Sequence, residues 1–523
     1  MSQLAYGKRL IVLGGGLSGL SFAHYLRNFL AYYKKTSLVN RVTLIEANEY
    51  MGGSVKTNVF DDHVVHELGP RSIRLAGAKA KNTCALIEQL GLADRLISVT
   101  PKSSAGKNRF VYREGKLYNV PSSPTAILSK MPATNTRLFS VLKKDILNSK
   151  RFDCSSYYDE DPPLYDFIAY RFGVDAAESV LDPLLRGITA GDARKTSTKS
   201  MFGDMLAKEQ IYGSIMKGLI KPPVTKSKHD ELFPHDILES KLLDKLQKES
   251  AVSFNLTTGL QTLPEHLCNS LLNSNDDDVI AIYNKTKVRE IKFNTTQSEK
   301  SPCSVTVETI DGDLVNIEAD HIISSIPAEN LSKVLPKSLV PEQKKALEFI
   351  QQIPHVPVGC VVLEYRNIEE LPQVVDSFGF LTHSKSQSKV LGISFDSTMF
   401  PQIDKHTRSF RMTCMIGGHW YKEIFGTDNL DKVTNAQLEQ IALEEVSKIL
   451  AIKDEPHRMS TWLWKTGIAQ YRPGHLGRVR SMREEIAKLK MPLTLLGQSY
   501  DGVAVNDVIW CARQAADEFV KSL

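Results

Sequence analysis

The sequence predicts an α/β fold, α+β overall, that begins with a strand–helix–strand unit of a parallel sheet. Residues 9–13 form a short apolar run that ends on three glycines. Residues 17–30 carry apolar side chains at helical spacing, and residues 41–46 have the pattern of a second buried strand. A strand, a glycine turn, a helix and a strand in this order are typical of a parallel sheet covered by helices.

Length and composition predict a large globular protein. The chain has 523 residues, of which 42% are hydrophobic and 24% are charged, and at about 100–200 residues per domain it has room for two to four domains. Its 65 Lys and Arg against 60 Asp and Glu give a net charge of +5. No basic stripe with interleaved aromatic residues occurs, so nucleic acid is not an expected partner. No apolar run reaches about 18 residues, which argues against a membrane-spanning helix and leaves peripheral attachment open.

The seven cysteines form no pair with the spacing of a metal or redox motif. They are spread from Cys84 to Cys511. An odd number without a Cys-x-x-Cys pair favours reduced thiols that pack as small apolar side chains. We therefore expect no metal site and no disulfide framework.

The middle of the chain changes in character twice. Residues 121–150 combine prolines and apolar side chains with several lysines and arginines. That pattern fits either a segment on an anionic membrane surface or ordinary helices under solvated cations. Residues 221–250 are polar and charged, which predicts a surface insertion. Further on, two strands joined at Asp311-Gly312 form a predicted hairpin that leads into a strand within residues 320–327.

The strongest local motif is a glycine-rich turn, Gly-x-Gly-x-x-Gly, that follows a strand and starts a helix. Gly14 permits the tight turn, Gly16 lets a pyrophosphate approach the backbone, and Gly19 allows the helix to pack closely on the sheet. The helix N-terminus supplies free N–H groups for phosphates. Glu46 ends the second strand, where a carboxylate accepts hydrogen bonds from ribose hydroxyls. This combination predicts a dinucleotide site.

Two further glycine-containing segments indicate which dinucleotide binds. Gly52-Gly53 is followed by residues 64–71, and glycines there let a loop pass close to the pyrophosphate and ring of a flavin. Near the C-terminus, residues 497–509 lead into an apolar helix, with Gly502 at its start offering N–H groups to an anion. Only one Gly-x-Gly-x-x-Gly turn occurs, so the second Rossmann unit of a nicotinamide-reducing flavoenzyme is missing. Oxygen, or another carrier, is therefore the expected electron acceptor.

Together these segments resemble the superfamily of FAD-dependent amine oxidases and protoporphyrinogen oxidases, and within it the mitochondrial-type protoporphyrinogen oxidase family. The resemblance covers most of the chain. The C-terminal segment is its most diagnostic part, because many flavoproteins share the opening motif. The matching segments are residues 12–20, 67–71 with 73–74, 108–110, 186–187 with 190–191, 320–328, 378–379, 415–418, 499–507 and 513–516.

The resemblance implies an oxygen-dependent oxidation of protoporphyrinogen IX to protoporphyrin IX, the penultimate step of haem biosynthesis. Six electrons leave the macrocycle, so it implies three rounds of hydride transfer to one noncovalent FAD, which O₂ reoxidises with release of H₂O₂. It also implies a peripheral place on the mitochondrial inner membrane, on the intermembrane-space side. A homodimer and hand-over of the product to ferrochelatase are further expected partners. Because the first motif glycine is residue 14, we expect no cleavable N-terminal presequence.

The same resemblance assigns cofactor contacts position by position. Ser54 stands where some members have tryptophan, and Gln498 stands where a small residue is common, so both are expected to contact FAD through backbone atoms. Val288 is expected to offer its backbone to the adenine. The complete expected set is Gly14, Gly15, Gly16, Leu17, Ser18, Gly19, Glu46, Gly53, Ser54, Gly69, Pro70, Arg71, Ser72, Val288, Gln498, Val503, Ala504 and Val505.

Arg109 is the residue expected to hold a propionate of the substrate. A large apolar ring with two carboxylates needs a cation at one end of an apolar cleft, and arginine can bind a carboxylate through two parallel hydrogen bonds. No general base is assigned, because nothing in the spacing of the histidines selects one. The other positions that match the family's cavity lining are Gly187, Phe378, Gly379, Leu381 and Met415.

The resemblance also implies three domains: a Rossmann-like FAD-binding domain, a mixed-sheet substrate-binding domain and a helical membrane-associating domain. The first two are expected to be discontinuous. The expected ranges are residues 1–104, 252–327 and 462–523 for the first, 105–120, 221–251 and 328–461 for the second, and 121–220 for the third.

Two other functions remain open at this point. An amine oxidase with covalent FAD would carry a cysteine within residues 466–475, where none occurs. A noncovalent polyamine oxidase passes that test, but an arginine anchor suits an anionic substrate rather than a cationic amine. The other alternative is an FAD-binding protein without turnover, which an aerobic assay with protoporphyrinogen would distinguish.

Overall fold

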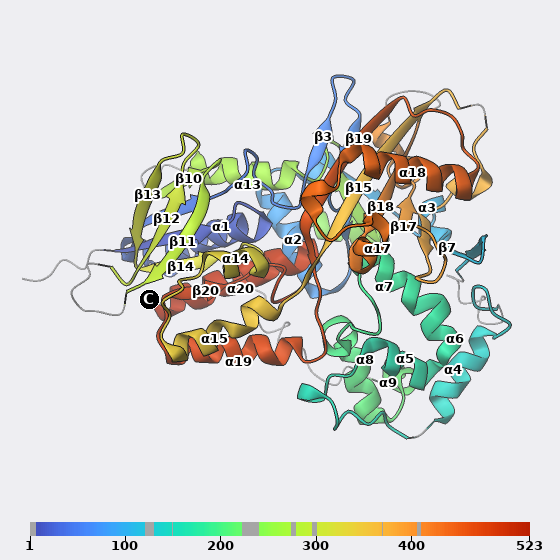
Figure 1. Cartoon of the computed structure of the whole chain (residues 1–523), viewed down its shortest axis with the longest axis horizontal. Coiled ribbons are helices and arrows are strands. Elements are labelled where there is room, and N and C mark those ends of the chain that lie inside the picture. The colour runs from blue at the N-terminus through green and yellow to red at the C-terminus, as the bar shows by residue number, and fades with distance from the viewer. Residues whose placement is uncertain are drawn as a thin grey trace, which may run out of the picture.

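A computed structural model shows two sheet-containing regions side by side, with a helical region against the second of them (Figure 1). Residues 121–129 of the expected membrane-associating segment and 222–239 of the expected insertion lie outside the described residues. The described residues are 7–120, 130–148, 150–221, 240–273, 279–294, 301–368, 370–404 and 409–523.

The first region is built on a five-stranded parallel sheet. β1 (Lys8–Leu13), α1 (Leu17–Tyr32) and β2 (Val39–Ile45) form the predicted opening unit, which is confirmed. β1 pairs in parallel with β2 and also with β14 (His321–Ser324), although more than 300 residues separate Leu10 from its partner His321. The strand order is β10-β2-β1-β14-β20, in which β10 is Ile280–Tyr283 and β20 is Leu493–Leu495.

Both faces of this sheet are covered, which explains why the last four residues of β1 are apolar and buried. Leu10 and Val12 point into a core shared with the first set of covering helices, whereas Ile11 and Leu13 point into a second core on the opposite face. The first set is α1, α2 (Gly77–Gln89), α12 (Lys241–Lys248), α13 (Thr262–Leu272) and α20 (Val505–Ser522). The second face carries β11 (Lys287–Phe293), β12 (Cys303–Glu308), β13 (Leu314–Ala319), α14 (Ala328–Val334), α15 (Pro341–Gln352) and α19 (His475–Lys488).

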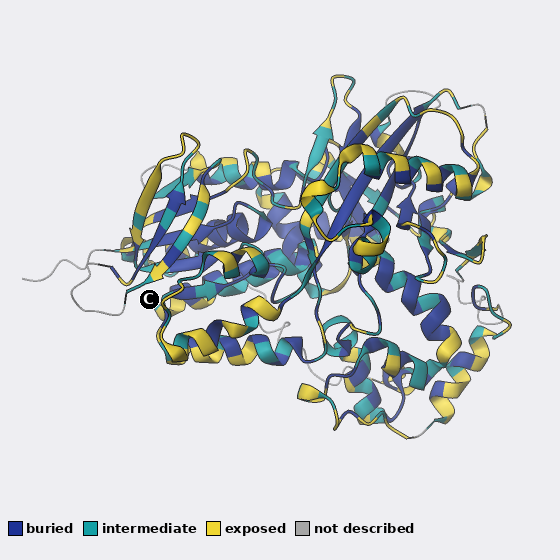
Figure 2. Ribbon diagram, viewed as in Figure 1, coloured by how far each residue is buried: buried dark blue, intermediate teal, exposed yellow. Residues whose placement is uncertain are grey.

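The second region is a mixed seven-stranded sheet in the order β19-β15-β18-β17-β16-β7-β8. Figure 2 shows its central strands almost entirely buried, because helices cover it. Its strands and covering helices are β7 (Phe110–Arg113), β8 (Lys116–Asn119), β15 (His355–Arg366), β16 (Gly379–Thr382), β17 (Val390–Ser394), β18 (Ser409–Gly417), β19 (Arg458–Ala469), α16 (Asp396–Met399), α17 (Tyr421–Phe425) and α18 (Asn435–Leu450).

The remaining strand pairs are the predicted hairpin and several short connecting elements. The predicted hairpin at Asp311-Gly312 is confirmed, since β12 and β13 pair antiparallel and Gly312 has a φ of +85°. β3 pairs with β4, and β9 pairs with both β5 and β6. These connecting elements are β3 (Thr57–Val59), β4 (Val65–Glu67), β5 (Ile73–Arg74), β6 (Leu96–Val99), β9 (Ser253–Leu256) and α3 (Ser104–Lys107).

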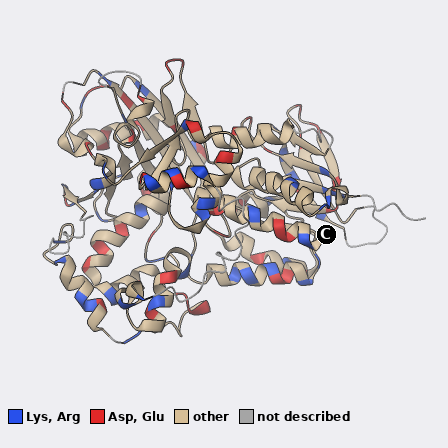
Figure 3. Cartoon of the chain, turned by 180° about the vertical axis from the view of Figure 1, so that it is seen from behind, with Lys and Arg blue, Asp and Glu red and all other residues tan. Residues whose placement is uncertain are grey.

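The helical region lies within residues 130–221. Seen from the back in Figure 3, basic and acidic residues are interspersed over its surface. None of the helices in the described ranges combines the length and hydrophobicity needed to cross a membrane. Its elements are α4 (Leu138–Leu147), α5 (Leu164–Phe172), α6 (Val174–Ala176), a π-helical turn (Ala177–Leu181), α7 (Asp182–Thr189), α8 (Thr198–Tyr212) and α9 (Ile215–Ile220).

The packing of three segments differs from the expected domain ranges. α12 was expected in a surface insertion, but its leucines at positions 242, 243 and 246 are buried in the core of the first region. The leucines recur at helical spacing and form one apolar face, but the charged residues between them give the segment a polar average composition. α14 and α15 pack on the first sheet rather than with the second region. The expected boundary at residues 461–462 falls inside β19.

A buried ion cluster holds the helical region together. Arg171 on α5 donates to Asp145 Oδ1 of α4 at 2.6 Å and to Glu209 Oε1 of α8 at 3.2 Å, and all three side chains are fully buried. Arg171 also donates to backbone carbonyls, including that of Gly213 at 2.8 Å. One guanidinium therefore joins three helices.

Replacing Arg171 by leucine should destabilise the helical region severely. The change leaves two carboxylates buried without their cation, which typically costs about 3–5 kcal/mol. The free energy of unfolding, measured by denaturant titration, tests this, with the exposed Lys143→Ala on α4 as the control. Equal unfolding midpoints for both variants would contradict the role assigned to the cluster.

Candidate functional site

The glycine-rich turn places an uncapped helix end beside the C-terminal edge of the parallel sheet. Gly14 has a φ of +102° and donates its N–H to Ile45 O at 2.8 Å, which fixes the turn between β1 and α1 against the end of β2. Gly16 is the N-cap of α1, no side chain caps it, and no acidic residue lies in the first turn. The first N–H groups of α1 thus have no intrahelical acceptor and can bind phosphate.

A second glycine pair closes over this helix end. The Gly52 N–H donates to Gly15 O at 2.8 Å. Gly53, with a φ of +61°, lies so close to Gly16 that a Cβ on Gly53 would come 3.1 Å from the Gly16 Cα. The two chains can approach in this way only because neither residue carries a side chain.

Glu46 lies at the end of β2, as predicted, and its carboxylate is buried. Its Oε2 accepts the Gly15 N–H at 2.7 Å, and its Oε1 accepts the backbone N–H of Asn48 at 2.8 Å. The Asn48 side-chain amide also donates to Oε1, at 2.6 Å, so Oε2 is the oxygen that keeps a further lone pair for a ribose hydroxyl. The Thr286 N–H donates to the Glu46 carbonyl oxygen at 2.9 Å, and this bond holds the start of the strand that bears Val288 beside Glu46.

The segment 69–72 is held by a residue that the sequence did not reveal. Asn255 on β9 donates to the Arg71 carbonyl oxygen at 2.8 Å and to Glu67 Oε1 at 3.1 Å. Glu67 is fully buried, and this burial raises the pKa of its carboxyl to about 7. Gly69 lies against the carbonyl oxygen of Ser54, where a Cβ would collide. The structure therefore brings Ser54 and the segment 69–72 together.

The C-terminal segment reaches the same helix end. Gly497, with a φ of +104°, packs against Ser18 at the start of α1. Tyr471 fixes the segment on its other side, because its hydroxyl donates to Gln498 O at 2.5 Å and accepts the Gly502 N–H at 2.7 Å. Val503, Ala504 and Val505 follow directly and lead into α20.

Replacing Tyr471 by phenylalanine should weaken flavin binding without unfolding the protein. The ring would keep its stacking on His475, at 3.9 Å between centroids, but the segment would lose two partly buried hydrogen bonds, a cost of about 1–3 kcal/mol. Fluorescence titration of the apoprotein with FAD measures the affinity.

Tyr500→Phe is the matched control for this variant. The Tyr500 hydroxyl is buried in the same segment and has no hydrogen-bond partner among the described residues. Its removal should leave flavin affinity nearly unchanged. Equal losses in the two variants would show that the Tyr471 hydroxyl does not position the segment.

The six residues expected to line a substrate cavity form one connected group. Leu381 on β16 lies against Gly187 on α7, where a Cβ would collide with its side chain, and also against Gly392 on β17. Gly392 is the register partner of Met415 on β18. Phe378 and Gly379 stand at the start of β16, beside β7. Gly379 is fully buried, Arg109 is exposed, and the other four members are half-buried.

Arg109 lies at one end of this group. Its guanidinium carbon lies 5.6 Å from the centre of the Phe378 ring. Desolvation and then the nearby Arg74 lower its pKa, although it remains a cation at neutral pH. At the other side, the Arg71 guanidinium lies 2.9 Å from Met415 Sδ, so a predicted flavin contact touches a predicted substrate contact.

The histidines have structural surroundings, and none is selected as a general base. His66 and His475 are buried, and His475 stacks on Tyr471. His355 Nε2 lies 3.0 Å from Ser499 Oγ, and His419 Nε2 lies 3.0 Å from Lys195 Nζ. Desolvation is the largest cause lowering the pKa of all four.

Comparison with known proteins identifies the family. Residues 17–519 match the model of the flavin containing amine oxidoreductases. The chain belongs to this family. Two mammalian relatives named protoporphyrinogen oxidase, from Bos taurus and Homo sapiens, are 32% and 31% identical to it, and each alignment covers 98% of both chains. A solved structure described as a putative protoporphyrinogen oxidase from Exiguobacterium has a TM-score of 0.74 at 23% identity, with complete coverage of both chains.

Family membership establishes a flavin cofactor and an oxidoreductase activity. The expected α/β fold class and the expected family are confirmed. The individual flavin and substrate contacts remain predictions. The structure brings the expected flavin residues together around the N-terminus of α1, and the expected substrate residues together around β16, β17 and β18.

Proposed function

We propose that this flavin-dependent oxidoreductase is an oxygen-dependent protoporphyrinogen oxidase, which converts protoporphyrinogen IX to protoporphyrin IX in haem biosynthesis. Its full-length similarity to relatives of that name carries the proposal. An arginine at the end of a half-buried group of apolar side chains fits a substrate with an apolar ring and carboxylate groups. Aerobic oxidation of protoporphyrinogen by the full chain tests it.

The residues around the α1 N-terminus fit one noncovalent FAD. Residues 14–19 would face the pyrophosphate, since no side chain caps this helix end. Glu46 would accept the ribose hydroxyls. No cysteine lies within residues 466–475 to form a covalent bond. When bound, FAD supplies a two-electron acceptor that oxygen can regenerate.

The protein's own part is to bind and orient the macrocycle. Arg109 would bind one propionate, and Arg74 lies close enough to add to the positive potential there. Leu381, Gly187 and Met415 would lie against the ring and exclude water from it. Gly187 leaves room where any side chain would strike Leu381. A cationic amine would be repelled by the same arginines, which disfavours a polyamine oxidase.

We also propose peripheral attachment to an anionic membrane through the helical region. α4 and α9 pack together and expose apolar side chains, among them Leu147, which is 67% exposed, and Ile220, which is 84% exposed. Lys143 and Lys144 lie on the same helix as Leu147. Insertion of such side chains beside cations is typical of an interfacial helix. The proposed location is the intermembrane-space side of the mitochondrial inner membrane. The proposal also includes a homodimer. It further includes hand-over of the product to ferrochelatase.

Replacing Leu147 and Ile220 together by glutamate should reduce binding to vesicles that contain anionic phospholipid. Each apolar side chain contributes about 1.5–3 kcal/mol when fully transferred from water, so partitioning should fall about tenfold or more. The control replaces Ile310 and Leu314, both 68% exposed on the β12–β13 hairpin, by glutamate. Equal losses in cosedimentation for the two double variants would place the membrane surface elsewhere.

A further inference from the structure

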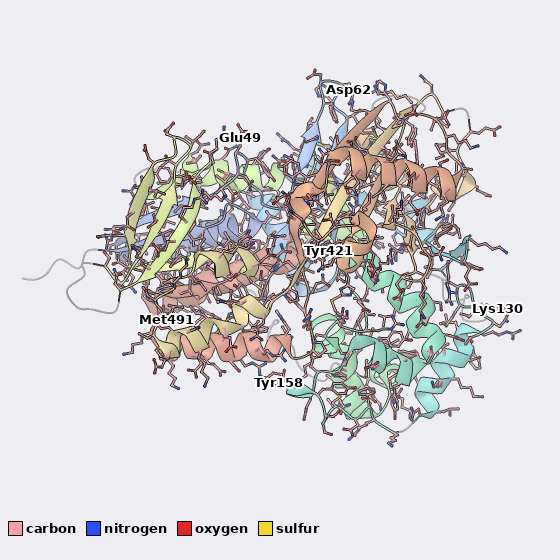
Figure 4. The ribbon with its side chains drawn as sticks, in the orientation of Figure 1. Glu49, Asp62, Lys130, Tyr158, Tyr421 and Met491 are labelled. Carbon is pink, nitrogen blue, oxygen red and sulfur yellow. The ribbon has the colours of Figure 1, made fainter. Side chains whose placement is uncertain are left out.

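A cavity outside the proposed flavin and substrate contacts lies where the helical region meets the second sheet. Its volume is about 330 Å³, which lies at the lower end of the usual range for small-molecule sites. Tyr421, labelled in Figure 4, lies in its wall between the sheet and α7. The lining residues come from the stretches 192–196, 354–356, 419–423 and 470–472.

Two exposed cations that line this cavity lack a carboxylate partner. In the part of the chain that the structure describes, no carboxylate lies within ion-pair distance of Lys195 or Arg472. Asp192, which also lines the cavity, faces His419 instead, at 3.9 Å between Oδ2 and Nε2. Burial and Lys195 lower the pKa of His419, so it stays neutral and accepts from the ammonium group of Lys195. Glu423 is the other acidic group in the lining.

The same cavity has an aromatic wall. Trp420 and Tyr421 line it, together with Val356 at the start of β15. The buried guanidinium of Arg186 lies over the Trp420 ring, 4.4 Å from its centre. Arg186 therefore adds positive potential behind the ring, although burial lowers its pKa to about 10. An aromatic face flanked by cations suits a flat, negatively charged molecule.

We propose that this cavity binds a small planar carboxylate. Lys195 and Arg472 would meet the carboxylate, and Trp420 would stack on or edge against the ring. A bound ligand would also stabilise the contact between the helical region and the second sheet, because the cavity walls are hydrogen-bonded to the end of α7. The backbone N–H of His419 donates to Ala190 O at 2.8 Å, and Gln470 Nε2 donates to Thr189 O at 2.9 Å.

Titration calorimetry on the flavin-loaded full chain tests the site with three probes. Benzoate carries both the ring and the charge, benzamide carries the ring alone, and inorganic phosphate carries charge alone. We expect saturable binding of benzoate, no saturable binding of benzamide, and phosphate binding that is weaker than that of benzoate. Saturating benzoate should also raise the melting temperature, since a ligand bound to the folded state stabilises it.

Three variants locate the binding. Replacing Lys195 and Arg472 together by glutamine should weaken benzoate binding about tenfold or more, the usual scale for lost charge-assisted hydrogen bonds. The control double variant changes Lys34 and Lys453, exposed lysines that do not line the cavity, to glutamine. Arg109→Ala should retain benzoate binding, which separates this site from the proposed substrate site.

Three results would overturn the proposal. The first is the absence of saturable benzoate binding to the wild-type chain. The second is benzoate binding that survives unchanged in the Lys195→Gln/Arg472→Gln variant. The third is phosphate bound in preference to benzoate, which would leave no role for the aromatic wall.

Discussion

Gly19→Ala is expected to yield a folded protein that has lost most of its flavin. A Cβ at this position of α1 would collide with the carbonyl oxygen of Gly14 and come within 2.9 Å of Ser325 Oγ. Because the closest of these atoms belongs to the backbone, the helix must move away from the sheet, and the turn proposed to receive the pyrophosphate moves with it. The ratio of flavin to protein absorbance after purification measures the loss.

Gly203→Ala is the matched control for this prediction. Gly203 also lies within a helix, α8, and apart from its chain neighbours and the adjacent helix backbone no described atom lies within 4 Å of the position of its added Cβ. Alanine should be tolerated there and could add about 1 kcal/mol of stability. A Gly19→Ala protein with full flavin content would refute the placement of the pyrophosphate at this turn.

Arg109→Ala is expected to raise the KM for protoporphyrinogen about tenfold to a hundredfold while flavin content stays normal. A hydrogen bond to a charged group contributes about 1.5–3 kcal/mol. Arg109→Lys should fall between wild type and alanine, because lysine keeps the charge and loses the paired geometry. Steady-state kinetics with matched flavin loading measures both values.

Arg113→Ala serves as the control for Arg109. Arg113 lies on the adjoining strand β7 and pairs with Glu114 at 3.1 Å. Its replacement should leave KM near the wild-type value. If Arg109→Ala keeps the wild-type KM, Arg109 does not bind substrate.

The parts of the fold with a strong local pattern could be predicted from the sequence. The run at residues 9–13, the glycine turn and Glu46 appear in the structure where the sequence placed them, because each is set by local geometry. α12 was missed as a core helix. Its three buried leucines stand within a strongly charged stretch whose overall composition resembles a loop.

Residues that act across the chain could not be found in the same way. Asn255 holds the Arg71 carbonyl oxygen across 184 residues of sequence, and Tyr471 bridges residues 27 and 31 positions further on. Neither belongs to a motif whose spacing has a chemical meaning. Their roles follow only from the folded arrangement, in which β9 and the end of β19 lie against the flavin segments.

The measurement that tests the central proposal most directly is aerobic turnover of protoporphyrinogen IX by the flavin-loaded full chain. Porphyrin fluorescence and peroxide should rise together, well above the rate of autoxidation. Three molecules of peroxide should form for each porphyrin, because six electrons leave in pairs. A chain that binds FAD but gives no rate above autoxidation would contradict the proposed function.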